Sequence, residues 1–98
     1  MVNRVKIIWS KRAQKDLKDV YDFYESKSEK AAENVVNDIL HTIENIVFEE
    51  QYQVDEILGK PYRRMVASHY RIVYRPKRSS ILIFRIFDNR QNPGKLKA

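Results

Sequence analysis

Residues 62–87, YRRMVASHYRIVYRPKRSSILIFRIF, decide the fold. Three runs in this stretch are rich in β-branched and aromatic residues, and they span Tyr62–Ala67, Tyr70–Arg75 and Ile81–Phe87. Ser68-His69 and Pro76–Ser80 separate them, and connections this short are typical of β-hairpins. The third run is apolar on both faces up to Arg85, as expected of a strand in the middle of a sheet. We therefore predict an antiparallel C-terminal sheet.

A two-residue turn at Ser68-His69 would fix the register of the first two strands. Paired residues share a face, so the pairs would be Ala67 with Tyr70, Val66 with Arg71, Met65 with Ile72 and Arg64 with Val73. Arg64 and Arg71 then lie diagonally on one face, roughly 7 Å apart at the backbone. We expect this face to be exposed, together with Tyr62, Val66, Val73 and Arg75. Its arginines repel one another unless an anion or an acidic partner lies over them, and a slip of one residue would reverse the faces.

The first half of the chain reads as a short strand followed by two helices. Arg4–Trp9 is the strand, Ser10 is a plausible N-cap, and apolar residues recur at helical spacing from Ala13 to Tyr24. Ser26-x-x-Glu29 matches a capping box, after which a second apolar stripe runs from Ala32 to Val47. The joint between the helices is only a few residues long, so they must form an antiparallel hairpin. Residues 49–61 read as a polar loop.

These elements predict a single α+β domain over residues 1–98, in the order β-α-α-β-β-β, with the helical hairpin packed on one face of the sheet. Met65, Tyr70, Ile72 and Tyr74 are expected beneath the helices. The chain has no cysteine, and its two histidines, His41 and His69, are far apart, so disulfides, thiolate chemistry and a zinc site are not expected. No motif implies a metal, an organic cofactor or a small-molecule substrate. We expect a cytoplasmic protein without a signal peptide or a membrane span.

Charge is divided unevenly along the chain. Residues 1–59 hold 8 Lys and Arg against 12 Asp and Glu, a net charge of −4. Residues 60–98 hold 11 Lys and Arg against Asp88 alone, a net charge of +10, and the two halves give the +6 of the whole chain. A stretch this basic attracts polyanions or acidic partners.

The same residues resemble a known family. Arg63-Arg64-Met65, Tyr70-Arg71-Ile72-Val73-Tyr74 and the segment from Arg85 to Pro93 are similar, in order, to motifs of the RelE/ParE superfamily of type II toxin–antitoxin systems. Trp9-x-x-x-Ala13-x-x-x-Leu17 resembles the opening of that family. The resemblance implies a bacterial toxin encoded beside a cognate antitoxin, which we expect to be a small acidic protein.

The resemblance leaves two kinds of target open. RelE-like members are ribosome-dependent mRNA endonucleases, and Arg64, Arg71 and Arg90 match basic positions that those enzymes use. ParE-like members share the fold and poison DNA gyrase. RelE-like enzymes also carry a proton-transfer residue near the C-terminus, whereas residues 88–98 here contain neither Tyr nor His. Arginine stabilises charge but is a poor acid or base, so this difference favours the ParE-like branch.

Three functions therefore remain as hypotheses. The favoured one is a gyrase poison, in which Arg64, Arg71, Arg75 and Arg90 bind the target. The first alternative is an mRNA endonuclease acting with the ribosome, in which Arg64, Arg71 and Arg90 are catalytic and Tyr62 or His69 replaces the missing acid or base. The second alternative is a non-toxic nucleic-acid-binding module. Whether the chain is an enzyme depends on which hypothesis holds.

Overall fold

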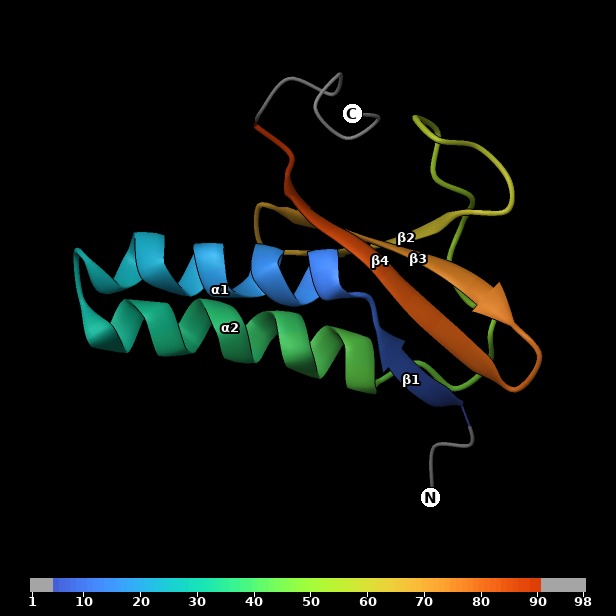
Figure 1. Ribbon diagram of the computed structural model, residues 1–98, viewed down its shortest axis with the longest axis horizontal. Coiled ribbons are helices and arrows are strands. Elements are labelled where there is room, and N and C mark those ends of the chain that lie inside the picture. Colours follow the sequence, from blue (N-terminus) through green and yellow to red (C-terminus); the bar gives the residue numbers. More distant parts are fainter. Residues whose placement is uncertain (1–4, 91–98) are drawn as a thin grey trace.

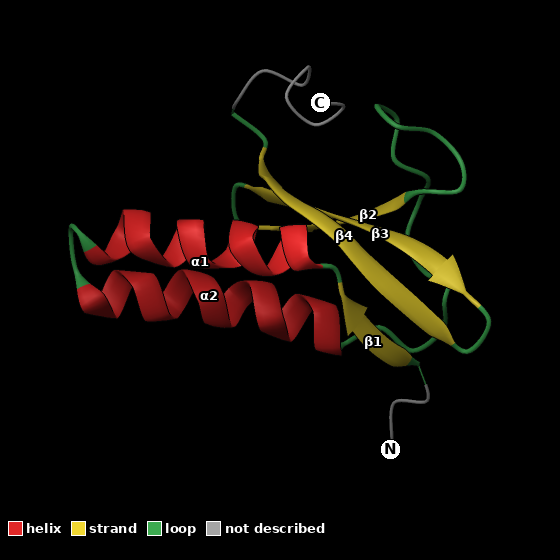
Figure 2. Ribbon diagram, in the orientation of Figure 1, coloured by secondary structure: helices red, strands yellow, loops and turns green. Residues whose placement is uncertain are grey.

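A four-stranded sheet and a helical hairpin make up residues 5–90, the part of the chain that the computed structural model describes (Figures 1 and 2). The elements follow the predicted order: β1 (Lys6–Trp9), α1 (Lys11–Glu25), α2 (Glu29–Glu44), β2 (Arg63–Ala67), β3 (Tyr70–Lys77) and β4 (Ser80–Asp88). The strands lie in the sheet order β1-β4-β3-β2, so β4 is central, as predicted. β1 runs parallel to β4, and the other neighbours are antiparallel.

The predicted register of β2 and β3 is confirmed. Ala67 faces Tyr70, Val66 faces Arg71, and Arg64 faces Val73. The second hairpin is tighter than predicted, because Lys77 pairs with Ser80 and only Arg78-Ser79 remain as the turn. Pro76 therefore lies within β3 rather than in a loop. Arg63, the first residue of β2, pairs with Tyr74, so at Pro76 the strand β3 pairs with β4 alone. A proline, which has no backbone N–H to donate, is tolerated at such a position.

Both helices begin at a serine. The Ser10 side chain accepts a hydrogen bond from the Ala13 amide in α1, and Ser28 accepts one from Ala31 in α2. The predicted capping box at Ser26 is wrong, because Ser26 is the C-cap of α1 and the chain must turn before α2 can start. The second helical stripe was also expected to reach Val47, but α2 ends at Glu44 and Val47 is 62% exposed.

The main core lies between the sheet and the helical hairpin. Met65, Tyr70, Ile72 and Tyr74 are buried there, on the predicted face of the sheet, with apolar residues of both helices. Figure 1 shows the two helices lying side by side and next to β1 and β4. No helix within residues 5–90 is both long enough and apolar enough to cross a membrane.

The opposite face of the sheet is partly covered, which corrects the expectation that all of it would be exposed, although Val66 and Arg75 do remain exposed. Val73 and Phe87 are buried in a second, smaller core that includes Ile57 and Leu58. These two residues come from the segment between α2 and β2, drawn in yellow-green in Figure 1. Val54 pairs with Arg63 along the outer edge of β2, so this segment continues the sheet before it folds over its face.

Candidate functional site

Arg64 and Arg71 lie on one face of the sheet, as predicted, but an acidic side chain of the same chain binds both. Glu56 Oε2 accepts hydrogen bonds from Arg64 Nε at 3.2 Å and contacts Arg64 Nη2 at 3.2 Å. Its other oxygen, Oε1, accepts one from Arg71 Nη2 at 3.0 Å. One carboxylate therefore bridges the two guanidinium groups.

A second acid, Asp55, also binds Arg71. Asp55 Oδ1 accepts a hydrogen bond from Arg71 Nη1 at 2.9 Å, and the Asp55 side chain is completely buried. Its Oδ2 accepts the amides of Ile57 and Leu58, which turns the segment back over the sheet. Asn89 Oδ1 accepts the remaining contact, from Arg71 Nε at 3.1 Å. The two arginines and two carboxylates form a neutral group, which we call the arginine–acid cluster.

The charges of the cluster also act on Glu56. Desolvation raises the pKa of the Glu56 carboxyl, but the positive charges of Arg64 and Arg71 outweigh it, so the pKa lies below its usual value. A carboxylate with a lowered pKa is a weaker proton acceptor near neutral pH. The cluster is thus suited to hold charge rather than to move protons.

Arg90 lies on the other face of the sheet. Its guanidinium binds both oxygens of Asp88, at 3.0 Å from Nε and 2.8 Å from Nη2. Asp88 pairs with Tyr70, which belongs to the helix-side core. The hydrogen bond from Arg90 lowers the pKa of Asp88 and, in return, raises that of Arg90. Arg90 is therefore not part of the arginine–acid cluster, although its side chain remains 56% exposed.

Arg75 is the predicted site residue that remains free for a partner. It is exposed near the end of β3, and no ion pair involves it within residues 5–90. Lys77 and Arg78 follow it at the same end of the hairpin, are also exposed, and likewise have no acidic partner in the described part of the chain. We call Arg75, Lys77 and Arg78 the hairpin cations.

Tyr62 and His69, the proposed substitutes for an acid or base, do not contact Arg64 or Arg71 through hydrogen bonds. The Tyr62 ring packs against the Phe84 ring, with centroids 4.9 Å apart, and borders the smaller core. His69 is exposed in the β2–β3 turn, where its carbonyl accepts the Asn89 amide at 2.7 Å. The side chains of Tyr62 and His69 make no hydrogen bond to Arg64 or Arg71.

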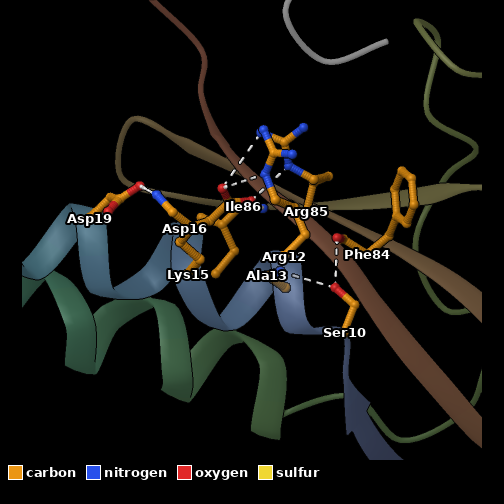
Figure 3. A network of polar contacts seen from close by, with 9 residues as sticks. All are labelled: Ser10, Arg12, Ala13, Lys15, Asp16, Asp19, Phe84, Arg85 and Ile86. Atoms are coloured by element: carbon orange, nitrogen blue, oxygen red, sulfur yellow. Dashed lines mark hydrogen bonds and ion pairs between the residues drawn. The ribbon is translucent and has the colours of Figure 1, made fainter. Parts of the chain in front are cut away.

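A groove of about 730 Å³ runs between α1 and the second half of β4. β1 pairs only with the first residues of β4, so within residues 5–90 the rest of this strand has no paired strand on that side. Ser10 Oγ donates to the Phe84 carbonyl at 2.9 Å, and Asp16 accepts the Ile86 amide at 2.9 Å (Figure 3). The groove is lined by cations, acids and apolar side chains that include Arg12, Lys15, Asp19, Val20, Phe23 and Phe87.

A buried ion pair forms one wall of this groove. Arg85 Nε donates to Asp16 Oδ2 at 2.8 Å, and both side chains are only 10% exposed. Figure 3 shows the Arg85 side chain reaching from β4 towards Asp16 on α1, with Arg12 close by. A bulge at this point of the sheet changes the register, since Val73 faces Arg85 and Tyr74 faces Ile83.

The acidic partners of these arginines, Asp16, Asp55 and Glu56, were not predicted from the sequence. Asp16 had a detectable signal, because it lies three residues after Ala13 and four before Val20, on the buried stripe of its helix. The sequence around Asp55 and Glu56 indicated only a turn. It gave no sign of their partners, which are 8 to 16 residues away along the chain.

Comparison with known proteins agrees with the resemblance seen in the sequence. Residues 7–93 match the model of the family described as ParE toxin of type II toxin-antitoxin system, parDE. A solved structure titled "Chromosomal ParDE TA system from P. aeruginosa" superposes with a TM-score of 0.70 at 21% identity, covering 87% of this chain and 96% of that one. At this identity the likeness shows the fold. Among curated proteins, none matches.

Proposed function

The chain belongs to the ParE toxin family of type II toxin–antitoxin modules, and on that premise we propose that it arrests bacterial growth by binding and poisoning DNA gyrase in the cytoplasm. The observation that carries the choice of target is the arginine–acid cluster. A nuclease needs Arg64 and Arg71 free to hold the scissile phosphate, whereas in the isolated chain Asp55 and Glu56 neutralise both. A toxin that acts by binding needs neither arginine for chemistry.

The hairpin cations are the surface that we assign to the target. They are exposed and unpaired in the described part of the chain, so they lose no internal contact when a partner binds. Arg90 is a second candidate because more than half of its side chain is exposed beside Asp88. Arg64 and Arg71 contribute through the shape of the face that they stabilise.

The antitoxin of this module is proposed to be acidic and to dock along the groove between α1 and β4. Arg12 and Lys15 line the groove and offer cations to an acidic segment, which would compete with their present partners on α1, Asp16 and Asp19. Phe23 is 54% exposed in the same groove and offers an apolar contact. An amphipathic helix or an added strand would satisfy both features.

A RelE-like mRNA endonuclease remains the alternative. Under it, the ribosome and mRNA are the partners, and Tyr62 or His69 must move to reach Arg64 and Arg71. The structure changes how this alternative is tested. Removing Arg71 leaves the buried Asp55 without its cation, so loss of toxicity in an Arg71→Ala variant would report misfolding as readily as lost catalysis.

Induction of the chain alone in a bacterial host tests the proposal. Plasmid supercoiling and, by primer extension, mRNA integrity are both measured within minutes of induction. Altered supercoiling with intact mRNA supports gyrase as the target, and codon-phased cuts with normal supercoiling refute it in favour of the nuclease. Harmless expression would point to the second alternative, a non-toxic nucleic-acid-binding module.

Variants connect this readout to the surface. Arg75→Ala combined with Arg78→Ala is expected to weaken growth arrest strongly. Lys11→Ala combined with Lys30→Ala is the control, because it removes the same charge from exposed helical positions. Equal loss in both pairs would indicate that net charge matters and that the assigned surface does not.

A further inference from the structure

The contacts of Glu56 resemble those of a bound oxyanion. Its two oxygens bind three guanidinium nitrogens on two different arginines, at 3.0 to 3.2 Å. Two oxygens bridging two arginine forks is also how proteins bind a phosphate group. A carboxylate from the chain thus takes the place that a ligand would occupy.

The positions of Arg71 and Asp55 do not depend on Glu56. Arg71 keeps Asp55 on Nη1 and Asn89 on Nε, so its guanidinium stays in place if Glu56 leaves. The backbone on either side of Glu56 is held separately, because Asp55 accepts the amides of Ile57 and Leu58. The nitrogens that would lose their partner are Arg71 Nη2 and, on Arg64, Nε and Nη2.

Glu56 is also the exposed member of the group. Its side chain is 58% exposed, compared with 18% for Arg64, 12% for Arg71 and none for Asp55. Exposed ion pairs contribute little to stability, so a competing anion can replace this carboxylate at low cost. Without Glu56, the two arginines and Asp55 carry a net charge of +1.

We propose that Arg64 and Arg71 form a phosphate-binding site that Glu56 occupies as an internal ligand, and that this carboxylate keeps the site closed to phosphate groups in the isolated chain. The site recognises the phosphate oxyanion, supplied either by a nucleic-acid backbone or as free phosphate. Its test is separate from that of the proposed action on gyrase, because it predicts phosphate binding rather than growth arrest.

Glu56→Gln tests the proposal with a labelled short single-stranded RNA, measured by fluorescence anisotropy at an ionic strength of about 0.15 M. This variant is expected to bind about tenfold more tightly than the wild type, the order of magnitude that one hydrogen bond to a charged group contributes. Glu33→Gln makes the same charge change on an exposed position of α2 and should alter affinity less than about twofold. Adding Arg64→Gln to Glu56→Gln should cancel the gain.

A second measurement separates the two sources of phosphate. Inorganic phosphate is titrated while NMR follows the guanidinium N–H signals of Arg64 and Arg71. Shifts in Glu56→Gln that the wild type lacks, together with the gain in RNA affinity, support a nucleic-acid backbone; the same shifts without that gain support free phosphate. Unchanged signals and equal RNA affinities in Glu56→Gln and Glu33→Gln would overturn the proposal.

Discussion

Asp55 and Glu56 are adjacent acids that bind the same arginine, yet their surroundings predict that removing them lowers stability by very different amounts. Asp55 is completely buried, whereas Glu56 is mostly exposed. Asp55→Ala removes one partner of a buried ion pair and two backbone contacts, so we expect a loss of about 3 to 5 kcal/mol in the free energy of unfolding. Glu56→Ala should shift the urea midpoint only slightly. Urea denaturation of both variants checks this, and equal losses would contradict the assigned roles.

The lowered pKa values of Glu56 and Asp88 predict how stability depends on pH. Desolvation opposes the shift at Glu56 but the two arginines outweigh it, and the hydrogen bond from Arg90 leads at Asp88. A carboxyl whose pKa is lower when folded stabilises the protein above its unfolded pKa, about 4, and loses this contribution as pH falls through the folded value. The stability difference between the wild type and a Glu56→Gln/Asp88→Asn variant should therefore be largest above about pH 5 and shrink below about pH 4.

Denaturation curves of the two proteins at several pH values, from below about pH 4 to above about pH 5, provide the measurement. A difference that stays constant, or that grows as pH falls, would contradict the assigned ion pairs.

At the level of residues, the sequence predicted that Arg64 and Arg71 share a face, because alternation and a two-residue turn define the register. It could not predict their occupant, because no periodicity relates a loop carboxylate to a strand several residues away.

Among the elements, α1 and α2 both start at a serine, but only one of these serines also contacts the sheet. Ser10 accepts the Ala13 amide and donates to the Phe84 carbonyl, whereas Ser28 accepts the Ala31 amide alone and is exposed. Ser10→Ala should therefore cost about 2 kcal/mol, for a lost cap and an unsatisfied carbonyl. Ser28→Ala should cost about 1 kcal/mol or less.

Thermal unfolding of the two variants compares these values directly. Equal changes would mean that the contact between Ser10 and Phe84 adds nothing to the cap.

The elements themselves were predicted well, because apolar periodicity separates helix from strand. Their ends were predicted less well, since Ser26 and Ser28 are both good caps and only the geometry of the turn between the helices selects Ser28.

For the whole molecule, folding brings the two oppositely charged halves of the sequence together. Arg64 and Arg71 pair with Asp55 and Glu56, and Arg85 pairs with Asp16, so three cations of the basic half meet acids of the other half. The sequence showed the imbalance but not this internal neutralisation, which depends on tertiary contacts. Arg75, Lys77 and Arg78, which have no acidic partner within residues 5–90, are left concentrated at the end of the β3–β4 hairpin.

This concentration predicts a position-dependent effect on association. Replacing all three hairpin cations by glutamine and replacing Lys11, Lys18 and Lys30 by glutamine each remove three positive charges. If gyrase is recognised through the hairpin, the first variant should associate with immobilised gyrase about tenfold more slowly at low salt, because steering acts through charges that face the partner. The second should change the rate about twofold or less, since charges on the helices lie on another surface and do not face the partner. At high salt the two variants should converge, and a gap that persists there would mean that the hairpin cations form direct contacts in the complex instead of only guiding the encounter.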